Sequence, residues 1–361
     1  MFLRSYIEVD EDVYRRNIRV LKEVSGKTLF MVIKANAYGL GDEEAVRIGL
    51  EEGIDHFAVS SLDEALRIRR FLTAGTILIL GYVDKDDLEE VRKNSLSIVT
   101  VSKDYVKDCG ERLQGIKIHL KLNTGMNRIG VRPEEAKETL DLLLSYGADI
   151  EGIMTHFVSS DDDEDYTHHQ AEVFKECLDS LNYDFKYIHT SNSDGTIHFP
   201  DDFTNAVRPG IALLGHGSYP SELRPCMSLY TQVVSAKKIP KGETVSYGRH
   251  FTADEDTYIM TLPIGYADGF YRSNTGKEVY IDGEYAKIVG SVCMDQMMIQ
   301  TKKLYPVGTR VEIFGEHIDI EKRAKELGTI VYELYTSLSE RLTRVYKKSG
   351  QTVRIVRPRF D

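Results

Sequence analysis

The sequence has no tryptophan, and only four cysteines and nine prolines occur among its 361 residues. The cysteines lack CxxC spacing and the density of a disulfide scaffold, so reduced thiols are expected. No apolar run approaches the roughly 18 residues that a membrane-spanning helix needs, and the first residues turn acidic before a signal-peptide core could form. We therefore expect a cytoplasmic protein without a membrane segment.

Basic residues are outnumbered, with 46 Lys and Arg against 57 Asp and Glu, which gives a net charge of −11. Such a chain repels a polyphosphate backbone, so nucleic acid is not an expected partner. The motifs HExxH, Walker A and GxGxxG are all missing, and no Cys/His ligand set stands in their place. The acidic run at residues 161–165 lacks the glycine and spacing of a calcium loop. We interpret that run as a solvated loop and predict no metal site.

Short β-rich runs alternate with helical patterns from residue 29 to about 214. The predicted strands are 29–34, 55–60, 76–80, 96–101, 116–122, 150–156, 186–189 and 205–213. Eight strands alternating with helices predict an α/β fold, a closed (β/α)₈ barrel of the TIM type. Beyond about residue 228, alternating strands with turn signals predict a mainly β domain. We expect domains at 1–228 and 229–361, with the first ten or so residues able to join the second.

Two helical patterns support the alternation. Tyr14, Ile18, Leu21 and Val24 recur at helical spacing, and Ser61 with Glu64 is typical of a capping box.

The carboxyl ends of the barrel strands are where this architecture carries chemistry. Strand alternation places Lys34 and His156 at the mouth of the barrel. In strand 116–122 it places His119 and Lys121 on one face and the apolar residues on the other. A lone lysine or histidine at such a position is most often a solvated or core residue. The surrounding motifs must therefore show whether it has a catalytic role.

Residues 32–39, VIKANAYG, resemble the pyridoxal-phosphate lysine motif of the alanine racemase family. Further segments match this family at suitable intervals to the end of the chain. The resemblance implies pyridoxal 5′-phosphate as cofactor, bound covalently to Lys34, with Tyr38 at its phosphate. An amine beside the cofactor aldehyde forms a Schiff base and can later act as a base.

Residues 121–130, KLNTGMNRIG, resemble a family segment whose lysine is often carboxylated. The resemblance implies that Lys121 supports Arg128 through a carbamate, and that Arg128 contacts the cofactor and the substrate carboxylate. Asn123 stands where aspartate is usual, which leaves the carboxylation of Lys121 open.

Three further barrel segments match the family. The resemblance implies that His156 lies at the cofactor ring, that Arg208 faces the ring nitrogen and that His189 supports Arg208. It also implies a phosphate site formed by Asn192, Ser193, Gly210 and Ile211. An arginine stays cationic, so the ring nitrogen stays unprotonated and withdraws less electron density, which discourages decarboxylation and transamination.

The second domain carries the remaining matches. The resemblance implies that Tyr247 is a second catalytic base. It also implies that Tyr266 lines the substrate entrance, that Met294 helps to hold the substrate carboxylate with Asp295 in support, and that Tyr346 reaches the cofactor phosphate.

The resemblance implies an alanine racemase that exchanges the α-proton between Lys34 and Tyr247 and supplies D-alanine for peptidoglycan. It implies a homodimer in which each active site is shared between subunits. A racemase of serine or another amino acid on the same scaffold stays open. A barrel decarboxylase is disfavoured by Arg208, and a pyridoxal-phosphate homeostasis protein by the domain that carries Tyr247.

Overall fold

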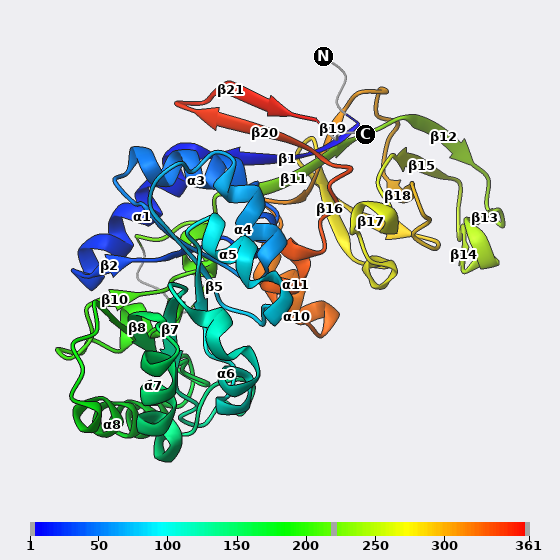
Figure 1. Cartoon of the computed structure of the whole chain (residues 1–361). Helices are drawn as coiled ribbons and strands as arrows, with labels where there is room; N and C mark the ends of the chain where they lie inside the picture. The colour runs from blue at the N-terminus through cyan, green and yellow to red at the C-terminus, as the bar shows by residue number, and fades with distance from the viewer. Residues whose placement is uncertain (1–3, 218–221, 358–361) are drawn as a thin grey trace. The chain divides into compact units, whose positions relative to one another are not determined.

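The computed structural model describes residues 4–217 and 222–357. The chain forms two compact units (Figure 1). The barrel unit comprises Tyr14–Ala37 and Gly41–Arg224, and the β unit comprises Met1–Val13, Tyr38–Leu40 and Pro225–Asp361. No helix in the described part of the chain is both long and apolar enough to cross a membrane.

The barrel unit is built on a parallel sheet that closes on itself. Its first strand is interrupted at Phe30: β2 (Thr28–Leu29) pairs with β10, and β3 (Met31–Val32) pairs with β4. The other strands are β4 (His56–Val59), β5 (Thr76–Ile79), β6 (Ser97–Val99), β7 (Lys117–Lys121), β8 (Asp149–Met154), β9 (Tyr187–His189) and β10 (Ala206–Val207). The first predicted strand covers both β2 and β3, and each of the other seven overlaps one observed strand, so the predicted barrel is confirmed.

The last predicted barrel strand was too long. It was expected over 205–213, but β10 ends at Val207 and a 3₁₀ turn, η4 (Ile211–Leu214), begins soon after. Pro209 has no amide hydrogen to donate to a sheet, and this shortens the strand.

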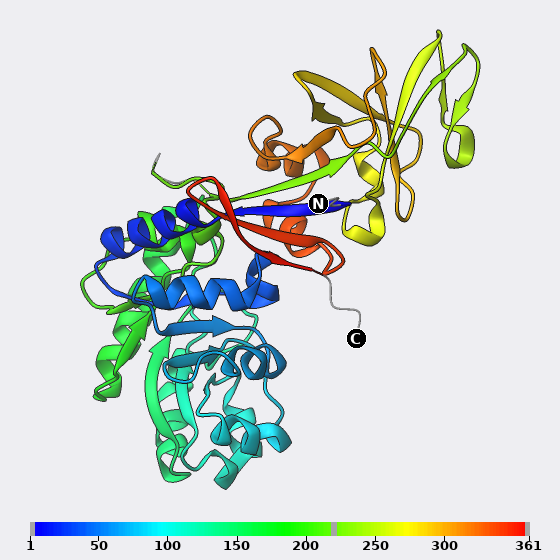
Figure 2. The ribbon, with the colours of Figure 1, turned by 90° about the horizontal axis from the view of Figure 1, so that it is seen from above.

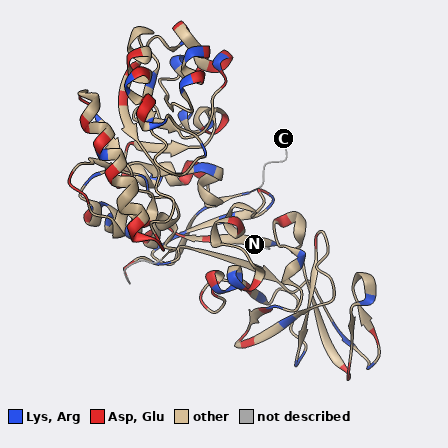
Figure 3. Ribbon diagram, turned by 90° about the horizontal axis from the view of Figure 1, so that it is seen from below, with Lys and Arg blue, Asp and Glu red and all other residues tan. Residues whose placement is uncertain are grey.

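Helices alternate with the strands of the barrel, and the ribbon in Figure 3 shows basic and acidic residues interspersed along them. They are α1 (Glu11–Ser25), α2 (Lys34–Tyr38), α3 (Asp42–Glu51), α4 (Leu62–Arg69), α5 (Leu88–Lys93), α6 (Lys103–Cys109), α7 (Ala136–Ser145), α8 (Glu164–Leu181) and α9 (Ser193–His198), with 3₁₀ turns η1 (Lys85–Asp87), η2 (Gly110–Leu113) and η3 (Pro133–Glu135). In α1, Tyr14, Ile18 and Leu21 are buried as predicted, whereas Val24 is 46% exposed. The apolar stripe of α1 therefore stops before the helix ends.

The β unit contains a ten-stranded sheet in the order β12-β15-β18-β17-β16-β19-β11-β1-β20-β21 and a hairpin, β13-β14. Its strands are β1 (Ser5–Asp10), β11 (Met227–Gln232), β12 (Ser235–Ile239), β13 (Thr244–Val245), β14 (Phe251–Thr252), β15 (Thr257–Leu262), β16 (Glu278–Ile281), β17 (Glu284–Val289), β18 (Met297–Thr301), β19 (Arg310–Phe314), β20 (Thr343–Lys348) and β21 (Gln351–Val356). Strand β1 pairs antiparallel with β11 and parallel with β20 (Figure 2). The predicted mainly β character of this unit is confirmed.

The remaining elements of the β unit are α10 (Ile320–Leu327), α11 (Val331–Thr336) and the 3₁₀ turns η5 (Tyr247–Arg249), η6 (Tyr266–Asp268) and η7 (Arg272–Asn274).

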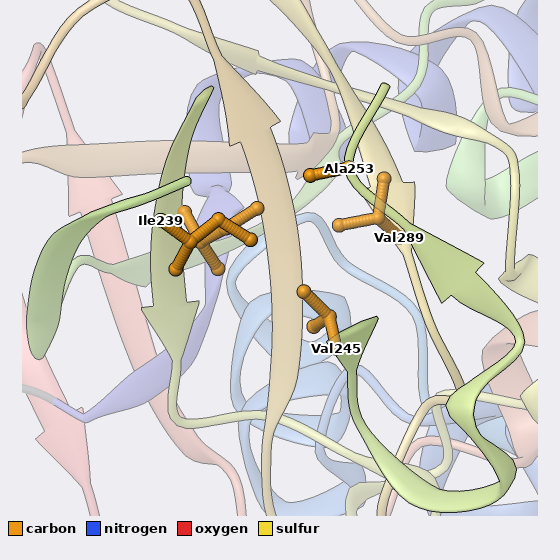
Figure 4. Close-up of a cluster of buried hydrophobic side chains, with 5 residues drawn as sticks. Ile239, Val245, Ala253 and Val289 are labelled. Atoms are coloured by element: carbon orange, nitrogen blue, oxygen red, sulfur yellow. The ribbon is translucent and has the colours of Figure 1, made fainter. Parts of the chain in front are cut away.

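A small apolar cluster anchors the hairpin of the β unit. Figure 4 shows the cluster, which consists of Ile239, Val245, Ala253, Ile259 and Val289. Phe251 and Met298 are partly buried and pack against it. Burial of such side chains is worth about 1.5–3 kcal/mol each for the larger ones. Because Val245 lies two residues before Tyr247, this cluster fixes one end of the turn that carries Tyr247.

Candidate active site

Lys34 follows β3 and opens a left-handed turn. Ala35, Asn36 and Ala37 have φ values of 53°, 55° and 53°, and Tyr38 follows at 54°. Residues other than glycine cost roughly 1–2 kcal/mol each in the left-handed region of backbone conformation, so the surroundings must hold the turn in place. One support is Asn36 itself, whose Oδ1 accepts a hydrogen bond of 3.0 Å from the amide of Asp42.

Glu64 is the second support of the turn. Its carboxylate accepts hydrogen bonds from the amide of Ala35 at 2.7 Å and from the amide of Ser60 at 2.8 Å. Ser61 caps α4 as predicted, accepting from the Glu64 amide at 3.3 Å. The capping-box prediction was wrong about the Glu64 side chain, because two amides outside the helix hold this carboxylate. Glu64 is thus a site residue that the sequence analysis missed.

Replacing Glu64 with alanine should loosen the turn behind Lys34. We expect a loss of about 1 kcal/mol in the free energy of unfolding and roughly tenfold or more in activity. Urea unfolding and a circular-dichroism assay of amino-acid turnover would measure the two effects. Glu64→Gln keeps an acceptor oxygen and should be milder in both. Unchanged activity in Glu64→Ala would remove Glu64 from the site.

The amine of Lys34 has a lowered pKa. Burial lowers this pKa most, the positive charge of Arg128 lowers it further, and Glu64 raises it in part. A lower pKa increases the neutral fraction of the amine, which is the form that attacks an aldehyde or accepts a proton.

Arg208 is 3% exposed, and it donates hydrogen bonds to residues at or just after the carboxyl ends of β8 and β9. Its Nη1 donates to Nδ1 of His189 at 2.7 Å, and its Nη2 donates to the carbonyl oxygens of Thr155 at 2.8 Å and Thr190 at 3.0 Å. Burial lowers the pKa of Arg208 to about 9, so the guanidinium stays charged near neutral pH. Its Nε–H is buried without a hydrogen-bond partner among the described residues.

The two predicted histidines both face Arg208. Nη2 of Arg208 lies 3.3 Å from Nδ1 of His156. An arginine can only donate, so Nδ1 of His156 and Nδ1 of His189 both accept. Burial, followed by the charge of Arg208, lowers the pKa of each histidine well below its ordinary value. Both imidazoles are therefore neutral, with the proton on Nε2.

Lys121 and Arg128 occupy different environments. Lys121 is 4% exposed, and burial together with the charges of Arg128, Arg208 and Lys34 lowers its pKa to about 7. Arg128 is exposed and forms no ion pair within residues 4–217 and 222–357. Asn123 accepts from the amide of Asn127 at 2.9 Å and donates to its side chain at 3.0 Å, which organises the turn that leads to Arg128.

The predicted phosphate segments meet at Ser193. Its hydroxyl oxygen accepts hydrogen bonds from the amides of Gly210 at 2.9 Å and Ala212 at 3.2 Å. Ile211 lies between these two residues, and Asn192 caps α9 by accepting from the amide of Gly195 at 2.9 Å. The segments that follow β9 and β10 are therefore joined at Ser193, at the end of the barrel where phosphate is commonly bound, and the amides of Gly210 and Ala212 already have the Ser193 hydroxyl as acceptor.

Tyr247 stands on a strained turn of the β unit. Ser246 has a φ of 68° and Arg249 a φ of 54°, and the Tyr247 side chain is 76% exposed. Two hydrogen bonds clamp the turn: Ser246 Oγ donates to the carbonyl of Ser291 at 2.7 Å, and Ser291 Oγ donates to the carbonyl of Tyr247 at 3.1 Å. Sequence analysis missed this clamp, which no motif signals.

The other predicted residues of the β unit fall into two groups. Tyr266 and Met294 are 42% and 53% exposed, and the amide of Tyr266 donates to the carbonyl of Cys293 at 3.1 Å, which joins their segments. Asp295 accepts a hydrogen bond of 2.7 Å from Arg341.

Tyr346 and Tyr38 form the second group. Tyr346 is 1% exposed, and its hydroxyl donates to the carbonyl of Leu40 at 2.7 Å, while Tyr38 packs against the ring of Tyr332. This proton of Tyr346 already has a protein acceptor, and its contact with a phosphate stays a prediction.

The barrel residues fit pyridoxal 5′-phosphate. The amine of Lys34 suits the cofactor aldehyde, and the unpartnered Nε–H of Arg208 suits an unprotonated ring nitrogen. The grouping of Ser193, Gly210 and Ile211 just after β9 and β10 suits the phosphate, because barrels commonly bind phosphate there. Fold and site together define a barrel enzyme that uses this cofactor.

Known proteins agree with this class. Residues 9–218 match the family model "Alanine racemase, N-terminal domain", and residues 226–346 match "Alanine racemase, C-terminal domain". The chain belongs to the alanine racemase family, which depends on pyridoxal phosphate. It is therefore a pyridoxal-phosphate-dependent isomerase of the racemase type. The matches to both domains do not favour the homeostasis-protein alternative.

Individual relatives match over nearly their whole length. An alanine racemase of Staphylococcus epidermidis is 36% identical, over 95% of this chain and 94% of the relative. The crystal structure of alanine racemase from Bacillus anthracis with bound L-Ala-P has a TM-score of 0.94 and 34% identity, over 99% of this chain and 98% of the other. A histidine racemase from Leuconostoc mesenteroides has a TM-score of 0.87 and 28% identity, over 96% and 98%.

Proposed function

We propose that this chain interconverts L-alanine and D-alanine. The observation that carries the proposal is that the buried Arg208, whose Nε–H has no partner among the described residues, lies at the same barrel mouth as Lys34, whose pKa is lowered. When bound, pyridoxal phosphate delocalises the negative charge that develops at the substrate α-carbon. An arginine at the ring nitrogen keeps that delocalisation weak, which suits reversible proton exchange better than decarboxylation.

Lys34 and Tyr247 are the proposed bases. Inversion at the α-carbon requires proton transfer on two opposite faces of a planar carbon, so one base removes the proton and the other returns one. We assign Lys34 to the D-enantiomer and Tyr247 to the L-enantiomer. We assign the substrate carboxylate to Arg128, and the assignment is supported by the lack of a carboxylate partner for Arg128 within the described residues.

The active site is proposed to be shared in a homodimer. Tyr247, Tyr266 and Met294 are strongly exposed for aromatic and apolar side chains, and this exposure supports a role toward a second copy of the chain. A monomer should then be nearly inactive. The cytoplasmic location and the supply of D-alanine to peptidoglycan stay predictions.

Carboxylation of Lys121 is a further part of the proposal. A neutral amine attacks carbon dioxide, forms an N–C bond and releases one proton, which yields a carbamate. Since the pKa of Lys121 is lowered to about 7, its neutral form predominates above that pH. The resulting negative charge would lie beside Arg128 and relieve the repulsion among the surrounding cations.

We expect the carbamate to form at pH 8 in bicarbonate and to be lost as the pH falls below about 7. Native mass spectrometry should show the mass of one added carbon dioxide, which Lys121→Ala should lack. Acetate should partly restore the activity of Lys121→Ala by returning a carboxylate. Lys137→Ala, which removes an exposed lysine from α7, is the control. An unmodified Lys121 in fully active enzyme would refute this assignment.

A panel of pure L-amino acids tests the proposed substrate. Circular dichroism should decay fastest for alanine, and serine and histidine serve as competitors because this scaffold also occurs in a histidine racemase. Turnover of another amino acid with alanine inert would overturn the assignment of alanine. Release of carbon dioxide instead of loss of optical activity would overturn racemisation.

A further inference from the structure

A chain of buried hydrogen bonds runs through the interior of the barrel, away from Arg208. His189 Nε2 lies 2.7 Å from Nδ1 of His119, and Nε2 of His119 lies 3.4 Å from Oε2 of Glu151. Ser97 donates to the same oxygen of Glu151 at 2.7 Å. Both histidines are 0% exposed, and Glu151 is 7% exposed. The proposed mechanism uses neither His119 nor Glu151.

The donors and acceptors of this chain can be ordered in only one way. Arg208 can only donate, so Nδ1 of His189 accepts and its Nε2 carries the proton. Nε2 of His189 then donates to Nδ1 of His119, which leaves the proton of His119 on Nε2. That proton points to Glu151, and an ionised carboxylate can only accept. The four residues therefore form a single directed series from a cation to an anion.

Burial and neighbouring charges agree with this order. Burial lowers the pKa of His119, against the opposing effect of Glu151, so this imidazole is neutral. Glu151 is ionised: burial raises its pKa, but the hydrogen bonds from His119 and Ser97 outweigh burial and lower it. Lys186 also faces Glu151, at 3.8 Å, and His56 faces His119.

Packing fixes where the His189 ring lies, but packing cannot choose its tautomer. The ring stacks on Phe30, with centroids 5.4 Å apart and planes 3° apart. The reversed tautomer would occupy the same space and point an N–H at the guanidinium of Arg208. Arg208 disfavours that arrangement from one side, because two donors would face each other. His119 disfavours it from the other side: its Nδ1 can accept only from Nε2–H of His189, because Glu151 takes the proton of His119.

We propose that His119 and Glu151 are positioning residues that lock His189 in its Nε2–H tautomer, and so keep Arg208 aimed at the cofactor nitrogen. This inference rests on the proposed function for its catalytic consequence, but the tautomers themselves exist with or without the cofactor. The signal in the sequence is slight: strand alternation turns His119 and Lys121 to the same face of β7.

The test is ¹⁵N NMR of the histidine side chains in the full-length protein, with and without pyridoxal phosphate. In the wild type, Nδ1 of His189 and Nδ1 of His119 should both be unprotonated, with both protons on Nε2. His119→Phe keeps an aromatic ring but removes the acceptor, so His189 should become a mixture of tautomers. We expect kcat to fall roughly tenfold, as is common when an outer partner of an active-site group is lost.

Glu151→Gln is the second variant and keeps the shape of the side chain. It should shift the Nε2–H resonance of His119 and lower kcat with little change in KM. Glu312→Gln is the matched control: it alters a buried glutamate that His317 contacts at 2.9 Å in the β unit. This control should leave the His189 signals and kcat unchanged.

The outcomes separate the two proposals. A proton on Nδ1 of His189 in wild-type enzyme that racemises alanine would overturn the inference and leave the proposed function standing. If the protein shows the stated tautomers but has no racemase activity, the inference stands and the proposed function is overturned. If Glu151→Gln lowers only thermal stability and leaves kcat and the histidine signals unchanged, the role is structural and the inference fails.

Discussion

Lys34→Ala should lose racemase activity by more than about 10⁴-fold, because the substitution removes both the covalent attachment of the cofactor and one of the two bases. The left-handed turn behind Lys34 is held by Asn36 and Glu64, so the backbone should keep its shape without the lysine side chain. The visible absorption band of the covalently bound cofactor should disappear. Circular dichroism of L-alanine and an absorption spectrum would measure the two effects.

Lys27→Ala is the matched control for this experiment. Lys27 lies just before β2, at the opposite end of the same barrel strand, and its amine bonds to the carbonyl of Asp201 at 2.8 Å. Its removal tests whether any lysine near this strand is needed for the fold. Lys27→Ala should keep both the absorption band and the activity, whereas a visible band that survives in Lys34→Ala would place the cofactor elsewhere.

Tyr247→Phe should lower racemisation by about 10²–10⁴-fold and leave the cofactor band intact, since only one proton-transferring group is lost. The Ser246–Ser291 clamp binds the backbone of the turn, so the phenylalanine ring should occupy the same position. Tyr285→Phe, which alters another exposed tyrosine of the β unit, should behave like wild type. Full activity in Tyr247→Phe would remove this residue as a base.

Mixing Lys34→Ala with Tyr247→Phe tests the shared active site. When equal amounts of the two variants exchange subunits at random, half of the dimers are hybrids. Each hybrid has one intact site, formed by Lys34 of one subunit and Tyr247 of the other, and one site that lacks both bases. About one quarter of wild-type activity should therefore return if sites are shared across a twofold axis. No recovery after proven subunit exchange would show that each chain builds its own site.

The architecture followed from local pattern. Short β-rich runs alternating with helices are enough to predict a parallel barrel, because each parallel strand needs a crossover before the next. The limits were set by single residues: Pro209 shortened the last strand, and Val24 lies beyond the buried stripe of α1. Neither effect appears in the spacing of apolar residues.

The site was less accessible to sequence reasoning. Strand alternation predicted that Lys34 and His156 lie at the barrel mouth, but the roles of Arg208 and Tyr247 could be predicted only from the family resemblance. The role of Glu64 could not be predicted, because the amide of Ala35 that it binds lies 29 residues earlier in the chain and contacts it only in the folded barrel. Contacts of this kind depend on tertiary structure.

The central claim is that pyridoxal phosphate is bound covalently to Lys34, which also acts as one of the two bases. Borohydride reduction of the holoenzyme, followed by proteolysis and mass mapping, tests this claim most directly. We expect a single cofactor-labelled peptide with the label on Lys34. A label on another lysine, or no label on protein that has been supplied with the cofactor, would contradict it.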